Sequence, residues 1–102
     1  DHNFCLTPHQ GEMVPACQVS AVDLRLEVTT DQPGVQLYNG RHINTGQTPG
    51  HGGFAYGPCA GLAIEPQFWP NTPHLPHFPS NLLMPGQVAI HRARFMLSRL
   101  VQ

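Results

Sequence analysis

One carboxylate in the sequence lies where an acid is costly unless it is paired or used. Glu65 ends the apolar run at residues 61–64 and shortly precedes Trp69. A carboxylate at the end of a buried strand needs an ion pair, hydrogen bonds or a catalytic role to offset its loss of solvation. Both a structural and an acid/base role stay open for Glu65. The arginines available for a structural pair are Arg41, Arg92 and Arg94.

Other side chains of the chain suit a small ligand rich in hydroxyl groups. Residues 1–3, Asp-His-Asn, are either a solvated start of a strand or a hydrogen-bonding edge for a polyol. Gln36 lies between two apolar residues and is expected to project from the opposite face of their strand. Phe68 and Trp69 are of the type that stacks on sugar rings, although burial in a core is the commoner role of aromatic residues.

The spacing of the His and Cys residues gives little support for a metal site or for catalysis by a nucleophilic side chain. His74 and His77 are three residues apart in a proline-rich segment, so they share no helix face, and no HExxH or CxxC motif completes a ligand set. Cys59 has no basic neighbour in the sequence, and the GxSxG motif is absent. We therefore expect no metal site.

The composition excludes partners that are recognised through charge. The 102 residues include 5 Lys and Arg and 6 Asp and Glu, which gives a net charge of −1. No basic patch is available for a nucleic acid or an anionic membrane surface. No apolar run approaches the roughly 20 residues that span a bilayer, and the first residues do not resemble a signal peptide. We expect a soluble, cytoplasmic chain with neither nucleic acid nor membrane as a partner.

The elements that must position these residues are predicted to be strands. Residues 22–28 alternate strictly between apolar and charged side chains, which indicates a strand with one solvated face. Residues 12–20 predict its antiparallel partner, in which Pro15 requires an edge or a bulge. Further strands are expected at 35–38 and at 60–64, the latter buried on both faces.

A last strand is expected at residues 87–97. Its two faces carry Ala89, Ala93, Phe95 and Leu97 on one side and Arg92 and Arg94 on the other.

The remaining segments are predicted to be loops, and the predicted fold class of the chain is all-β. Residues 41–58 are rich in Gly, Thr, Asn and His, and residues 66–85 are rich in proline. No segment has a convincing helical period, so strands joined by hairpins and long loops predict a β-sandwich. An abrupt start, long loops and an apolar strand that needs cover favour a portion of a larger sandwich.

Ordered blocks of the sequence resemble the C-terminal part of the aldose 1-epimerases, the galactose mutarotases. The blocks are DHNF at 1–4, TTDQPGVQLYNG at 29–40, GLAIEPQFWPN at 61–71, HFP at 77–79 and LLMPGQ at 82–87. The resemblance implies a galactose mutarotase-like β-sandwich, or supersandwich, built from a much longer chain. Residues 1–102 would be the C-terminal third of that single domain, with the upstream part missing.

The resemblance also implies roles for three residues. The Glu of the third block is the family's general base and matches Glu65, whereas the Asp of the first block and the Gln of the second bind sugar hydroxyls and match Asp1 and Gln36. The family's general acid is a His that lies upstream, so none of the 7 histidines here inherits that role. Arg41 and Pro66 depart from the family pattern at positions that bear on the choice of sugar.

The implied reaction interconverts the α and β anomers of a hexose such as galactose or glucose. Glu65 would take the proton of the anomeric hydroxyl while an upstream acid protonates the ring oxygen, so that the ring opens, turns about the C1–C2 bond and closes. This chemistry requires no metal and no organic cofactor. The alternatives are a carbohydrate-binding module of the same superfamily without turnover, a hexose-6-phosphate mutarotase, and a structural β domain without a ligand.

Overall fold

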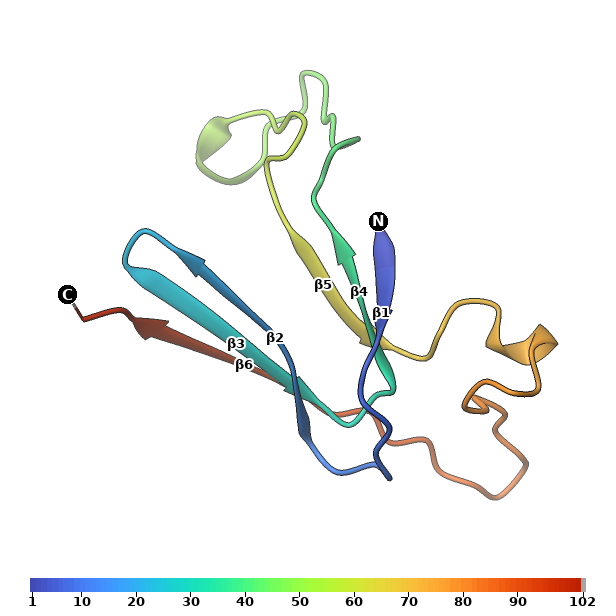
Figure 1. Cartoon of the computed structure of the whole chain (residues 1–102). Coiled ribbons are helices and arrows are strands. Elements are labelled where there is room, and N and C mark those ends of the chain that lie inside the picture. The colour runs from blue at the N-terminus through green and yellow to red at the C-terminus, as the bar shows by residue number, and fades with distance from the viewer. Residues whose placement is uncertain (102) are drawn as a thin grey trace.

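The computed structural model describes residues 1–101, which form two three-stranded antiparallel sheets. The strands are β1 (His2–Cys5), β2 (Val14–Ala21), β3 (Leu24–Thr30), β4 (Gly34–Tyr38), β5 (Ala63–Gln67) and β6 (Ala93–Arg99), with two short 3-10 helices, η1 (His51–Gly53) and η2 (Thr72–His74), in the connections. One sheet has the order β1-β4-β5 and the other β2-β3-β6. The sheets approach each other at one end and diverge toward the other (Figure 1). The all-β prediction is confirmed.

Strands β2 and β3 form the antiparallel hairpin that the sequence predicts, with Ala21 opposite Leu24. The predicted start of β3 is wrong, because Val22 and Asp23 form the turn, where Val22 has a φ of 54° and is 94% exposed. A tight hairpin turn requires a positive φ at one or both of its central residues, and here Val22 has it. The two turn residues therefore lie outside the strand. Pro15 lies in an edge strand beside a register shift, so its predicted position is confirmed.

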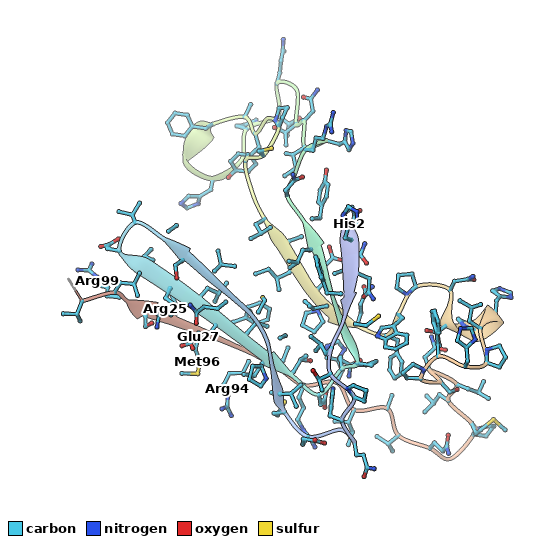
Figure 2. All side chains as sticks on the ribbon, viewed as in Figure 1. His2, Arg25, Glu27, Arg94, Met96 and Arg99 are labelled. Carbon is cyan, nitrogen blue, oxygen red and sulfur yellow. The ribbon has the colours of Figure 1, made fainter. Side chains whose placement is uncertain are left out.

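The last strand begins later than predicted, at Ala93 instead of residue 87. Ala93 pairs with Thr30, the final residue of β3, so residues 87–92 have no β3 residue left to pair with. The predicted faces hold within the strand: Figure 2 shows Arg94 on the side away from the other sheet, whereas Phe95 lies opposite the buried Val28.

The prediction of a strand at 60–64, buried on both faces, is wrong. Strand β5 begins at Ala63, which pairs with Tyr38 at the end of β4, and residues 60–62 are exposed and outside the strand. Strand β5 lies at the edge of its sheet and continues to Gln67. Glu65 therefore lies in the middle of a strand that is partly exposed, not at the end of a buried one.

Few apolar side chains are fully enclosed by the two sheets. Val28 of β3 and Val35 of β4 are each 1% exposed. Phe95 and Leu97 lie on the same face of their sheet as Val28, yet they are 52% and 69% exposed. Much of this apolar face is thus uncovered. The two sheets diverge from the end at which they meet, as Figure 1 shows.

A carboxylate joins the end of β3 to the segment that enters β6. Asp31 Oδ1 accepts hydrogen bonds from the backbone N–H of Arg92 and from Gln32 Nε2, both at 2.9 Å, and Asp31 Oδ2 lies 3.7 Å from Arg92 Nη1. The side chain of Asp31 is 5% exposed. Burial by itself raises the pKa of Asp31, but the hydrogen bonds and the charges of Arg92 and His91 outweigh it, so the pKa is lowered.

We expect this junction to lose stability in acid. Because the folded pKa of Asp31 is below its unfolded value of about 3.9, its stabilisation is complete above that pH and is lost as the pH falls through the folded pKa. Urea unfolding of the full-length protein from neutral pH to about pH 2 should therefore show a shallower loss of stability in Asp31→Asn. Asp23→Asn, in an exposed turn, is the control. Identical pH profiles for Asp31→Asn and the unchanged protein would contradict this role.

Candidate functional site

All three strands of the sheet β1-β4-β5 contribute polar side chains to one of its faces. Asn3 lies directly opposite Gln36, and Gln36 lies directly opposite Glu65. Residues paired in this way point to the same side of a sheet, so these three side chains are neighbours across three strands. The buried Val35 precedes Gln36 and lies on the other face. We call the set Asp1, Asn3, Gln36, Glu65 and Gln67 the polar face.

Hydrogen bonds connect four members of the polar face. Gln36 Nε2 donates to Asp1 Oδ1 at 2.6 Å. Gln67 Nε2 donates to Gln36 Oε1 at 3.2 Å and to Asn3 Oδ1 at 3.5 Å. The structure thus brings the two predicted binding residues, Asp1 and Gln36, into direct contact, although they are 35 positions apart in the sequence.

Glu65 is exposed and lies beside Gln36 in the middle of β5. The ion pairs among residues 1–101 join His9 to Glu12 and Arg92 to Asp31. Glu65 therefore has no arginine partner in the described part of the chain, and Arg92, one of its expected partners, pairs elsewhere. A carboxylate in this position is accessible to a ligand that lies on the polar face.

The strand pairing divides the Asp-His-Asn cluster that the sequence presents as one group. Asp1 and Asn3 belong to the polar face, whereas His2 is paired with Leu37 and lies on the other face, at the start of β1 (Figure 2). Gln67 is a member of the polar face that the sequence analysis missed. The period of two residues along a strand could have identified it, because Gln67 follows Glu65 by two positions.

Trp69 closes one end of the polar face. A Cβ on Gly34 would lie 2.7 Å from Trp69 Cδ1 and 2.9 Å from Asn3 Oδ1, so a glycine lets these side chains lie against the strand. The indole Nε1 donates to the carbonyl of Pro33 at 2.9 Å, and its ring meets Phe78 edge to face at 4.9 Å. A fixed aromatic ring therefore stands beside the polar face, where it could stack on a ring-shaped polar ligand.

The loop at residues 41–58 begins at the opposite end of the polar face. Tyr38 follows Gln36 by two positions and shares its face, and its hydroxyl oxygen accepts a hydrogen bond from the backbone N–H of His42 at 2.8 Å. Within the loop, the backbone N–H of Thr45 donates to the carbonyl of Tyr56 at 3.0 Å. This segment is a loop, as predicted, and contains only the short helix η1.

The polar face offers two carboxylates and three amides to a ligand. Carboxylates accept hydrogen bonds from hydroxyl groups, and amides both donate and accept them, so the set suits a neutral ligand with several hydroxyls. In the described residues, no three His, Cys, Asp or Glu side chains gather as ligands for a metal ion. No helix in that part of the chain is long and apolar enough to cross a membrane.

Comparisons with known proteins give matches along nearly the whole chain. The family model for aldose 1-epimerase matches residues 1–95. Galactose mutarotase of Sus scrofa is 40% identical over 99 residues, which are 96% of this chain and 29% of that protein. Galactose mutarotase of Homo sapiens is 39% identical over the same lengths, and aldose 1-epimerase of Escherichia coli (strain K12) is 35% identical over 91 residues, 85% of this chain and 26% of that protein.

The chain spans 29% of the length of the mammalian relatives it matches. The matched region includes every member of the polar face, from Asp1 to Gln67.

Proposed function

Because the chain belongs to the aldose 1-epimerase family, we propose that it carries the general base and part of the sugar site of a mutarotase. Its fold is a β-sandwich of that family. The proposed reaction interconverts the α and β anomers of a hexose such as galactose or glucose. We propose that it is carried out by a longer protein, of which residues 1–102 would form the C-terminal third. The observation that supports this proposal is the meeting of Asp1, Gln36 and Glu65 on one exposed face.

In the proposed mechanism Glu65 takes the proton from the anomeric hydroxyl. An acid from the upstream part of the protein protonates the ring oxygen, so the ring opens, C1 turns about the C1–C2 bond, and closure gives the other anomer. Asp1 accepts a hydrogen bond from a sugar hydroxyl, and the second N–H of the Gln36 amide donates one to the sugar. Two fixed partners would hold the sugar in register with Glu65, which is how positioning contributes to rate.

The direct test is polarimetry of freshly dissolved α-galactose and α-glucose with the full-length protein. Faster decay of optical rotation than in buffer alone is expected for both sugars. Galactose binding without any acceleration would contradict turnover and favour a carbohydrate-binding module of the same superfamily. Glucose 6-phosphate serves as a third substrate, and we expect it to be disfavoured because Asp1 and Glu65 place two carboxylates on the polar face.

A further inference from the structure

The charge of Asp1 sets the direction of the hydrogen bonds on the polar face. An ionised carboxylate only accepts hydrogen bonds, so Gln36 must turn its amide nitrogen toward Asp1, to which it donates at 2.6 Å. The opposite orientation would place Gln36 Oε1 against the carboxylate oxygens. With the nitrogen committed to Asp1, Oε1 points the other way and needs a donor.

Gln67 supplies that donor. Its Nε2 lies 3.2 Å from Gln36 Oε1 and 3.5 Å from Asn3 Oδ1, and an amide nitrogen has two hydrogens to give. Gln67 is half-buried, unlike the exposed Glu65 two residues earlier. The network therefore runs in one direction, from Gln67 to Gln36 and from Gln36 to Asp1, with Asn3 as a second acceptor of Gln67.

We propose that Gln67 is a positioning residue of the sugar site, which acts by holding the amide of Gln36 in the orientation that binds a hydroxyl group. This inference rests on the proposed function, since it assumes that Gln36 contacts the sugar. Held between Gln67 and Asp1, Gln36 needs no reorganisation when the sugar arrives, and the second N–H of its amide is left to donate to a hydroxyl group. Pre-organisation of this kind lowers the entropy cost of binding and acts on affinity before it acts on the chemical step.

The test is a double-mutant cycle in the full-length protein with Gln67→Leu and Gln36→Leu. We expect Gln67→Leu to raise KM about 2- to 10-fold, the worth of one hydrogen bond, with kcat changed less than about twofold. In the Gln36→Leu background the same substitution should have almost no further effect, because the group it positions is gone. An effect on KM that persists undiminished in that background overturns the proposal, since Gln67 would then act directly or through another residue.

One control variant and one stability measurement separate this role from a purely structural one. Gln18→Leu makes the same change at an exposed position of β2, on the other sheet, and should leave KM and kcat unchanged. A fall in melting temperature with a matching fall in kcat for Gln67→Leu would indicate a structural role and overturn the proposal.

A readout that does not need turnover distinguishes failure of this inference from failure of the proposed function. The side-chain amide signals of Gln36 in a ¹H–¹⁵N spectrum are assigned by their absence in Gln36→Leu. Gln67→Leu should shift these signals and weaken galactose binding, followed by titration, whether or not the protein accelerates mutarotation. Unshifted Gln36 signals and unchanged galactose affinity would overturn the inference and leave the mutarotase proposal intact.

Discussion

Replacing Glu65 by Gln in the full-length protein is expected to lower kcat for mutarotation by about 10²- to 10⁴-fold, the usual contribution of a positioned general base. An amide has nearly the size and shape of the carboxylate, but it cannot take the proton of the anomeric hydroxyl. Binding should survive, because the amide still forms hydrogen bonds, so KM should change by less than about tenfold. Polarimetry over a range of α-galactose concentrations separates the two constants.

The matched control for this substitution is Glu27→Gln. Glu27 lies in the middle of β3 as Glu65 lies in the middle of β5, but it belongs to the other sheet, where it pairs with Gln18 and Met96. Its replacement removes the same charge and should leave kcat within about twofold of the unchanged protein. Equal rates for Glu65→Gln and Glu27→Gln would exclude Glu65 as the general base.

The alternation of side chains along single strands was the part of the fold that the sequence predicted well. Gln36 was expected on the face opposite its apolar neighbours, and it lies there, beside Asn3 and Glu65. The position of Pro15 followed in the same way from its missing N–H, because an edge strand or a bulge is where that donor is not needed. Both predictions depend only on the residue itself and its neighbours along the strand, so the sequence is sufficient to make them.

Strand ends were predicted less well, because the partner strand decides them. Strand β5 begins at Ala63 because β4 ends at Tyr38, and β6 begins at Ala93 because β3 ends at Thr30. The composition of residues 60–64 and 87–97 does not indicate where either strand begins. The structure places Glu65 in the middle of a partly exposed strand, not at the end of a buried one. The argument that a buried carboxylate needs a partner therefore does not apply to Glu65.

The contact between Asp1 and Gln36 could not be derived from the sequence pattern. It depends on the pairing of β1 with β4 across 35 positions, and nothing local specifies which strands meet. The resemblance to a family assigned roles to these two residues instead. It assigned none to Gln67, although Gln67 lies in the same block as Glu65, because its hydrogen bonds become visible only when all three strands are in register.

The second large effect is expected when residues 1–102 are produced without the rest of the protein and their folding is measured. In isolation this segment is expected to show no cooperative thermal transition by circular dichroism and to bind a dye that reports exposed apolar surface. Its apolar side chains are mostly uncovered, and each one left in water forfeits about 1.5–3 kcal/mol of stabilisation. The apolar residues of β6 illustrate this, with Phe95 at 52% and Leu97 at 69% exposed.

The full-length protein is the reference for this experiment, and it should melt cooperatively with little dye bound. A double variant of the isolated segment, Phe95→Ser with Leu97→Ser, should bind less dye than the unchanged segment, because both side chains lie on the uncovered face. A sharp two-state transition of the isolated segment would mean that two small sheets with Val28 and Val35 as their buried core suffice for folding. The proposal that residues 1–102 are the C-terminal third of a larger sandwich requires other parts of the protein to cover the apolar faces of both sheets. Cooperative folding of the isolated segment would show that no such cover is needed, and would contradict that proposal.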